Sequence, residues 1–283
     1  MATFTNRATL TYSGRSTDSN TVTGTLAETL SVTKTALIDT YLPGGTSAYV
    51  VSLVNTGATP YTGLTVTDDL GAYPVGESQI YPLAYLDGSV LYYINGVLQA
   101  SPAPVATQPL TFTGITVPAG GNATLVYDTA LTGFAPLDAA GQITNRVDVT
   151  GAGLTAPVTD TATVTAVAGA ELTITKALNP TVVPENGVIT YTFTIQNYGN
   201  ADAVATDDVS VTDTFDPILE NITVTYEGVA WTEGTEYTYD ETTGVFTTVP
   251  SQITVPAATY TQSETGEWIV TPGTVTLTVT GTV

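Results

Sequence analysis

The chain has neither cysteine nor histidine among its 283 residues. The lack of cysteine excludes disulfide bonds and thiol nucleophiles, and the lack of histidine excludes His-based catalytic triads and His-ligated metals. Carboxylates are then the only strong metal ligands, and no acidic loop has the spacing of an EF-hand. We therefore expect neither a metal site nor a cofactor.

Basic residues are also scarce. Five lysines and arginines stand against 26 aspartates and glutamates, which gives a net charge of −21. This charge argues against nucleic acid and anionic membrane surfaces as partners. Residues 1–6 lack the basic start and apolar stretch of a signal peptide, and no run is long and apolar enough to span a bilayer. Export would then require a leader removed before residue 1 or another route, such as release with a spore.

The residues that are abundant favour β-strands. Valine and threonine are abundant, apolar residues alternate with threonine over short runs such as residues 191–195 and 276–280, and 26 glycines and 16 prolines are scattered between such runs. No long stretch has helical spacing. Short strands of this kind, in domains of about a hundred residues or somewhat more, predict an all-β protein built from immunoglobulin-like sandwiches.

An internal repeat indicates two such domains. Lys34 and Lys176, Tyr49 and Tyr191, and Asn55 and Asn197 are each separated by 142 positions. Two copies that share these positions are versions of one fold. We expect an N-terminal segment over residues 1–30, a first domain over 31–167 and a second over 168–283.

The N-terminal segment itself repeats a piece of the middle of the chain. Residues 4–11 read Phe-Thr-Asn-Arg-Ala-Thr-Leu-Thr, and residues 143–150 read Ile-Thr-Asn-Arg-Val-Asp-Val-Thr. The middle copy closes the first domain and leads into the second. The N-terminal copy follows no domain, and the second domain reaches residues 276–283 without a copy of its own. We therefore expect a spare closing strand, an open second domain and a subunit that joins head to tail.

Strand periodicity places polar side chains on the apolar faces. In the first domain the inward residues are Lys34, Asp68 and Asn145, and in the second they are Lys176 and Asp213. In the spare segment Asn6 shares a face with four apolar or small residues, which we expect to form the donor strand: Phe4, Ala8, Leu10 and Tyr12.

An inward lysine, aspartate and asparagine form the set needed for a spontaneous isopeptide bond. Burial favours the neutral amine that attacks the amide carbonyl and favours a protonated carboxyl that passes protons. We expect Lys34 and Asn145 to join within one chain, with Asp68 as the proton shuttle. Between chains, we expect Lys176 to join Asn6, with Asp213 in the same role.

These motifs resemble a known family. A Thr-Lys pair near the domain start, Tyr-x₅-Asn-x-Gly, Val-Thr-Asp and Thr-Asn-x-Ala/Val are similar to the conserved-repeat domain of bacterial and archaeal surface proteins, the domain of unknown function eleven. The resemblance covers most of residues 31–283. It implies immunoglobulin-like domains on a cell surface and, by analogy with Gram-positive pilins, isopeptide bonds.

Each inward residue also has a simpler interpretation. The lysines could extend to solvent near a strand end, the aspartates could cap turns, and the asparagines could bond nearby backbone. Asn55 and Asn197 are rival acceptors, but their Asn-x-Gly context is more typical of a turn.

Other functions remain open. The aromatic stretches could form a sugar-binding platform: Tyr81, Tyr85, Tyr92, Tyr93, Trp231, Tyr237 and Tyr239. Acidic residues around Asp207 and Asp208 and over 233–241 could bind Ca²⁺, but a solvated acidic surface is the favoured interpretation. No paired-carboxylate pattern indicates a glycosidase.

The combined prediction is a structural subunit of an extracellular, cell-surface or spore-surface filament. It would assemble with itself by donor-strand complementation, in a contact that does not close on itself. Its only chemistry would be self-cross-linking. The alternative is a surface adhesin or carbohydrate-binding stalk.

Overall fold

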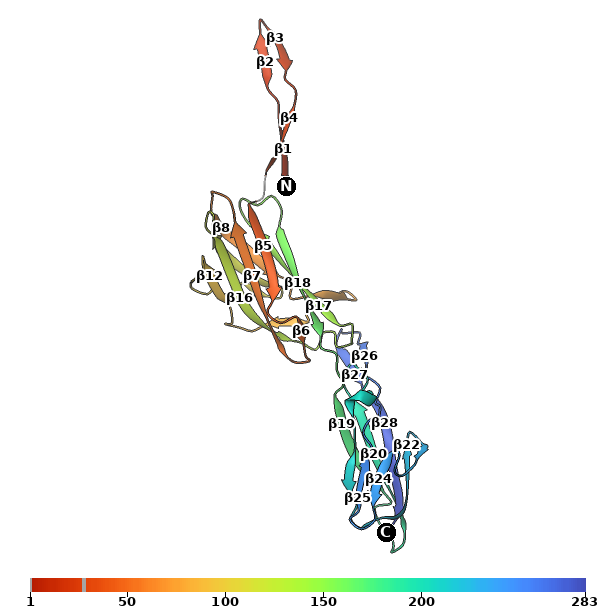
Figure 1. Ribbon diagram of the computed structural model, residues 1–283. Helices are drawn as coiled ribbons and strands as arrows, with labels where there is room; N and C mark the ends of the chain where they lie inside the picture. The colour runs from red at the N-terminus through yellow and green to blue at the C-terminus, as the bar shows by residue number, and fades with distance from the viewer. Residues whose placement is uncertain (1, 27–28) are drawn as a thin grey trace. The chain divides into compact units, whose positions relative to one another are not determined.

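A computed structural model of the protein describes residues 2–26 and 29–283. The expected all-β fold class is confirmed: the chain forms two tandem β-sandwiches and a separate N-terminal arm of strands, with one short 3-10 turn, η1 (Ala205–Asp207) (Figure 1). The two compact units divide at residues 165 and 166, and the loop 137–141 belongs to the second unit. None of the described helical segments is long and apolar enough to cross a bilayer.

The first unit consists of two packed sheets. One has the strand order β13-β12-β16-β7-β5, with β11 also paired to β16, and the other has the order β14-β15-β8-β17-β18-β6. The first sheet comprises β5 (Leu30–Ala36), β7 (Thr46–Asn55), β11 (Leu83–Tyr85), β12 (Leu91–Ile94), β13 (Val97–Leu98) and β16 (Asn122–Leu131). The second comprises β6 (Thr40–Tyr41), β8 (Tyr61–Asp68), β14 (Ala106–Thr107), β15 (Leu110–Val117), β17 (Gln142–Thr150) and β18 (Val158–Ala166). A small hairpin joins β9 (Tyr73–Val75) to β10 (Ser78–Ile80).

Alternation along these strands builds the core. In β5 and β17 every second residue is buried, and Thr or charged residues on the other face are exposed. This period-2 pattern turns one face of each strand toward the opposing sheet. The largest fully buried side chains of the unit include Tyr49, Phe112 and Tyr127, which pack ring against ring.

The second unit repeats the first sheet without a counterpart of β11, and it repeats the second sheet only in part. Its larger sheet has the order β19-β20-β28-β22-β23, and its smaller sheet has the order β21-β25-β24. These strands are β19 (Leu172–Asn179), β20 (Val188–Asn197), β21 (Thr212–Thr214), β22 (Glu220–Tyr226), β23 (Val229–Trp231), β24 (Tyr237–Asp240), β25 (Val245–Thr248) and β28 (Gly273–Thr282). A further hairpin pairs β26 (Thr259–Gln262) with β27 (Trp268–Thr271).

Register relates the two units strand by strand. Lys34 lies opposite Val51 and Lys176 opposite Phe193, so β19 and β20 correspond to β5 and β7. In the smaller sheet β21 and β25 pair at Asp213, as β8 and β15 pair at Asp68. In the first unit the free side of β8 is filled by β17, and β17 is followed by β18. Within the described residues of the second unit, no strand pairs with the corresponding side of β21.

The N-terminal arm differs from the single donor strand that the sequence predicted. It is a two-stranded ribbon, in which β1 (Ala2–Asn6) pairs with β4 (Val22–Leu26) and β2 (Thr9–Tyr12) pairs with β3 (Arg15–Asp18). The chain reverses at Ser13 and Gly14, which both have positive φ, as a two-residue hairpin turn requires. The expected strand is therefore interrupted at Arg7 and Ala8. Residues 1, 27 and 28 of the expected 1–30 segment lie outside the described residues.

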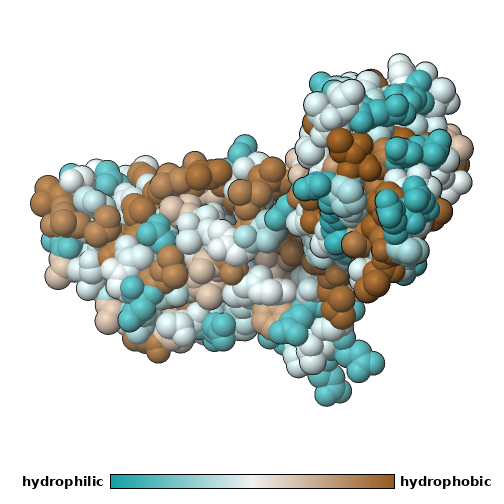
Figure 2. Space-filling view, turned by 90° about the horizontal axis from the view of Figure 1, so that it is seen from below, coloured by the Kyte–Doolittle hydropathy of each residue, from teal (hydrophilic) through white to brown (hydrophobic). Residues whose placement is uncertain are grey.

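Apolar side chains reach the surface in several places. The space-filling view shows brown apolar patches between teal and white ones (Figure 2). Exposed large apolar residues occur in the arm (Phe4, Leu10, Tyr12 and Val22) and along β19 (Leu172, Ile174 and Leu178). Single exposed apolar residues are ordinary, but two elements that are exposed along their length are each candidates for an interaction.

Candidate functional site

Lys34 is buried in the first unit, as its place in the strand predicted. Its side chain has no solvent exposure, and its ammonium forms an ion pair with Asp68 on the opposing sheet. Its backbone N–H donates a 2.7 Å hydrogen bond to Oδ2 of Asp160 on β18. A lysine is seldom fully buried without such a partner. The ion pair and the backbone bond together fix Lys34 over the β8, β17 and β18 side of the sandwich.

Asp68 receives three hydrogen bonds. Both the Lys34 ammonium and the Tyr127 hydroxyl donate to Oδ2, and the backbone N–H of Leu70 donates to Oδ1 at 2.8 Å. Asp68 thus caps a turn, as its simpler interpretation expected, and also faces the lysine. Tyr127 was not identified from sequence, because an inward tyrosine in a strand looks like any other core residue.

Burial sets the protonation chemistry of this site. Desolvation lowers the pKa of Lys34, and the nearby carboxylates of Asp68, Asp69 and Asp160 only partly oppose it. Desolvation also raises the pKa of the Tyr127 hydroxyl well above its ordinary value, and the charge of Asp68 acts in the same direction. The amine is therefore shifted toward the neutral form that can act as a nucleophile, and Tyr127 stays protonated as a donor.

Asn145 is fully buried on β17, and its amide lacks hydrogen bonds. Neither Oδ1 nor Nδ2 has a partner among the described residues. Burial raises the pKa of the Tyr49 hydroxyl, and the adjacent side chains of Ser47 and Asn145 act in the opposite direction. The Lys34 ammonium lies 5.0 Å from the centre of the same Tyr49 ring. A buried amide without partners costs about 1–3 kcal/mol, so this arrangement needs an explanation.

The strand register places Asn145 diagonally from the ion pair. Val147 lies directly opposite Asp68 in the β8–β17 pairing, and Asn145 is two residues along the same face. Long side chains at such diagonal positions can meet across a sheet. The first unit thus gathers the three residues that the sequence singled out, and their proposed cross-link remains a prediction.

The rival asparagines have a different role. Nδ2 of Asn55 donates to the carbonyls of Thr59 and Pro118 at 2.8 and 3.0 Å, and its Oδ1 accepts from Gly57 N–H at 2.9 Å. Asn197 repeats this pattern with its own turn. Both are satisfied turn residues, which agrees with the interpretation of Asn-x-Gly as a turn.

We expect Asn55→Ala to destabilise the first unit without affecting its chemistry. The substitution leaves partly buried backbone groups unpaired, which costs about 1–3 kcal/mol. Urea unfolding should show this loss, and the intact mass of the purified chain should match that of unaltered protein apart from the substitution. A change in ammonia loss for Asn55→Ala would contradict the assignment of Asn55 to the turn alone.

The second unit has the same ion pair in an uncovered setting. Lys176 pairs with Asp213, and its ammonium lies over the rings of Tyr191, Phe193 and Phe215 at 4.3 to 5.5 Å. Its side chain is nevertheless 40% exposed, whereas that of Lys34 has no exposure. Lys176 faces inward as predicted, but no strand covers it in the part of the chain that the structure describes.

Tyr127 has no counterpart in the second unit. Tyr49 lies opposite Tyr127 across β7 and β16, and the equivalent Tyr191 lies opposite Val279. Val279 is buried and offers no hydroxyl to Asp213. The carboxylate of the second unit therefore lacks one of the donors that Asp68 has.

The apolar face of β19 is open along its length. Leu30 and Val32 of β5 are 3% and 8% exposed, and their equivalents Leu172 and Ile174 are 37% and 52% exposed. A hollow of about 170 Å³ lies between β19 and the segment before β21, lined by Leu172, Thr173, Ile174, Ile195, Val209, Ser210 and Val211. A second hollow of about 540 Å³ shares Leu172 and Val209 with it. We call these two adjoining hollows together the β19 groove.

The arm carries the remaining predicted residues. Asn6 ends β1, with Phe4 before it, and Leu10 and Tyr12 lie on β2. Ala8 lies between the two strands and exchanges hydrogen bonds with Ser19: its N–H donates to the serine hydroxyl at 3.0 Å, and its carbonyl accepts from the Ser19 N–H at 2.8 Å. Asn6 does not meet a lysine within the arm, because the described arm contains none.

The aromatic stretches do not form an exposed platform. Tyr92 and Tyr237 are buried, the Tyr92 hydroxyl donates to the carbonyl of Thr116, and the Tyr239 hydroxyl donates to that of Leu219. Tyr85 packs edge-on against Phe112. These residues fill the cores and tie strands together, so the structure gives no support to a sugar-binding face.

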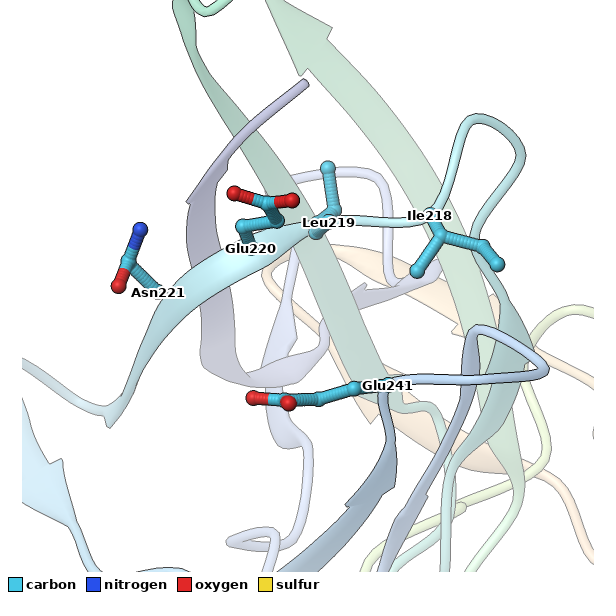
Figure 3. Close-up of a pocket in the computed structure, with 5 residues that line it drawn as sticks. All are labelled: Ile218, Leu219, Glu220, Asn221 and Glu241. Carbon is cyan, nitrogen blue, oxygen red and sulfur yellow. The ribbon is translucent and has the colours of Figure 1, made fainter.

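A hollow at the other end of the second unit is acidic. It has a volume of about 440 Å³ and is lined by Ile218, Leu219, Glu220, Asn221 and Glu241. The carboxylates of Glu220 and Glu241 point in different directions and do not converge (Figure 3). Over the described ranges, no group of three or more Asp, Glu, His or Cys side chains could hold a metal ion.

Comparisons with known proteins show only distant likeness. No family model and no curated protein matches the chain. Among solved structures, the major pilin subunit BcpA of Bacillus cereus is 12% identical with a TM-score of 0.35, covering 96% of this chain and 73% of that one. The pilus backbone RrgB of Streptococcus pneumoniae is 12% identical with a TM-score of 0.33, covering 86% and 56%. A collagen-binding domain of a Staphylococcus aureus adhesin is 11% identical with a TM-score of 0.30, covering 49% and 99%. Likeness at this level transfers no function.

Proposed function

We propose that this protein is a structural subunit that assembles with itself head to tail into a filament. Residues 2–26 of one chain occupy the β19 groove of another, at the side of β21 where the first unit has β17 and β18. The observation that carries this proposal is the contrast between β5, which is covered, and β19, which is exposed along its length. The arm repeats the sequence of the strands that cover β5.

The chemistry of the two surfaces is complementary. The groove offers exposed Leu172 and Ile174, and the arm offers exposed Phe4, Leu10 and Tyr12. Burying the three arm side chains contributes about 5–9 kcal/mol. Association and ordering of the arm cost about 4–15 kcal/mol, so apolar contact alone gives a reversible junction even with added strand hydrogen bonds.

A covalent bond would make the junction permanent. In the proposed reaction the neutral amine of Lys176 attacks Cγ of Asn6, a C–N bond forms, the bond from Cγ to the amide nitrogen breaks, and ammonia leaves. Asp213 accepts the proton of the attacking amine and returns it to the departing nitrogen, so no other reactant is needed. In the first unit Lys34, Asn145 and Asp68 perform the same exchange within one chain.

The proposed setting is an extracellular, cell-surface or spore-surface filament. The acidic, cysteine-free sequence and its resemblance to conserved-repeat surface domains support this placement. A contact between two unlike surfaces of the subunit propagates into a fibre when its rotation does not close a ring.

The test is Ile174→Asp, which places a charge in the β19 groove. Ile174 is exposed, so the monomer should unfold within about 0.5 kcal/mol of wild type. Assembly should be abolished, because docking would bury an unpaired carboxylate. Sedimentation and electron microscopy of the purified protein measure this outcome.

The matched control is Val182→Asp, in a loop of the same unit. Val182 is 86% exposed and does not line the groove. It should leave assembly unchanged. Fibres of normal length from Ile174→Asp would refute the groove as the docking site. A wild-type chain that stays monomeric at all concentrations, with its own arm in its own groove, would refute the filament.

A further inference from the structure

The backbone N–H of Lys34 points out of the edge of its sheet. β5 pairs only with β7, so alternate N–H groups on its other side have no strand partner. The N–H of Lys34 is satisfied by a side chain instead, since Oδ2 of Asp160 accepts it at 2.7 Å. Asp160 lies on β18, opposite Val147, on the face that turns into the sandwich. The carboxylate of Asp160, in the β17–β18 hairpin, thus binds the backbone of the edge strand β5 in the opposing sheet.

The corresponding group in the second unit is the backbone N–H of Lys176. β19 is also an edge strand, and Lys176 occupies the register position of Lys34. Its N–H therefore points away from β20, toward the β19 groove. No acceptor among the described residues takes this hydrogen bond. An unpaired edge N–H beside an exposed apolar surface is a specific binding feature.

The arm carries a carboxylate at the equivalent place. Asp18 comes shortly before Thr21-Val-Thr23, and Asp160 comes at the same distance before Thr163-Val-Thr165. The two aspartates, like the two Thr-Val-Thr runs, are separated by the 142 positions of the repeat. We propose that Asp18 of an incoming arm accepts the backbone N–H of Lys176 and sets the register of docking. This inference rests on the proposed head-to-tail assembly and adds the residue that aligns Asn6 with Lys176.

The register of the isolated arm keeps Asp18 on the other face. In β2–β3 Asp18 lies opposite Thr9, and Leu10 lies opposite Thr17. Cross-strand partners share a face, so Asp18 points away from Leu10, whereas Asp160 shares the core face of Val147. The difference arises because three residues, 19–21, oppose only Arg7 and Ala8, which makes a bulge. Shifting one strand by one residue turns its side chains over.

Two contacts hold this register. Arg7 forms a 3.0 Å ion pair with Oδ2 of Asp18, and the Thr9 hydroxyl donates to Oδ1 at 2.6 Å. Docking in the register of β17–β18 requires Asp18 to leave these partners and turn to the groove face. Arg7 therefore competes with Lys176 for Asp18, so the Arg7–Asp18 ion pair of the free arm slows assembly.

The experiment uses two full-length chains that cannot cross-link alone. Lys176→Ala serves as the donor of an arm, and Asn6→Ala serves as the acceptor, so mixing them yields one boil-resistant dimer. The rate of appearance of this dimer on denaturing gels is the readout. Three changes are made in the donor: Asp18→Ala, Asp18→Asn and Arg7→Ala.

Opposite effects are expected. Asp18→Ala removes the acceptor and should slow dimer formation about tenfold. Asp18→Asn keeps an acceptor oxygen but loses the charge that Arg7 holds, so its rate should equal or exceed that of the parent pair. Arg7→Ala should raise the rate, by up to about fivefold for an exposed ion pair. If Asp18 only stabilised the free hairpin, all three changes would slow the reaction alike.

The outcomes separate this inference from the assembly on which it rests. If the parent pair forms no dimer on gels or in sedimentation, both the assembly and the role of Asp18 are refuted. If the parent pair forms dimer and Asp18→Ala matches its rate, the assembly stands and the role of Asp18 is refuted.

Discussion

Asn6→Ala will convert boil-resistant multimers into chains that separate on a denaturing gel. Asn6 is the only proposed electrophile of the arm, and alanine leaves its apolar residues in place. Fibres should still form but should dissociate on dilution, since apolar contact and strand pairing give only a reversible junction. The measurement is denaturing electrophoresis of boiled protein, with sedimentation of the undenatured sample. The monomer band should still have lost one ammonia, from the proposed bond between Lys34 and Asn145.

The matched control for Asn6 is Asn20→Ala in the same arm. Asn20 is an exposed amide, and the corresponding position of β18 is Ala162. The ladder of multimers should persist in this variant. Removal of residues 2–26 should abolish the reversible fibres as well. A ladder that survives in Asn6→Ala would show that the cross-link uses another residue.

Asp68→Asn will leave the first unit uncross-linked and much less stable. The asparagine has the same shape but cannot take the proton of Lys34 or balance its charge. Relative to the uncross-linked chain, loss of one partner from a buried ion pair costs about 3–5 kcal/mol, and the variant also lacks the cross-link of the wild type. Intact mass should show no loss of ammonia from the first unit, and urea unfolding should show an earlier transition. Wild-type protein should have lost that ammonia.

Two controls separate chemistry from packing. Asp69→Asn changes the neighbouring carboxylate, which accepts the backbone N–H groups of Gly71 and Arg146 but does not contact the lysine ammonium. It should keep the cross-link. The double variant Lys34→Met/Asp68→Leu removes the charges together, so much of the stability should return, because apolar residues often replace a buried ion pair without loss. Ammonia loss from the first unit in Asp68→Asn would contradict the role of Asp68.

The strand faces were the part of the structure that the sequence predicted best. Alternation of apolar residues and threonine follows from the strand geometry itself, so the inward positions of Lys34, Asp68 and Asn145 agree with the structure. The repeat of 142 positions carried the same reasoning to Lys176 and Asp213. Within the described residues, β21 of the second unit pairs only with β25, so its other side has no strand partner.

Other features depend on contacts that no local pattern reports. Tyr127 reaches Asp68 from a strand 59 positions away, and Asp160 reaches the Lys34 N–H across 126 positions. The hairpin of the arm was missed for a different reason. Ser13-Gly14 is a turn signal between two alternating runs, but the likeness of residues 4–11 to β17 led to a single extended strand.

The path of the chain through the first unit has a mechanical consequence. The arm enters this unit at β5, and the chain leaves it at β18. These strands contact each other directly, because Asp160 of β18 holds the N–H of Lys34 and the side chain of Lys34 reaches the sheet that contains β17. Tension along a filament would thus pass from the entry strand to the exit strand through Lys34, without crossing β7 or β16. The subunit would then carry tension through the contacts of Lys34, and its core strands would not be pulled apart.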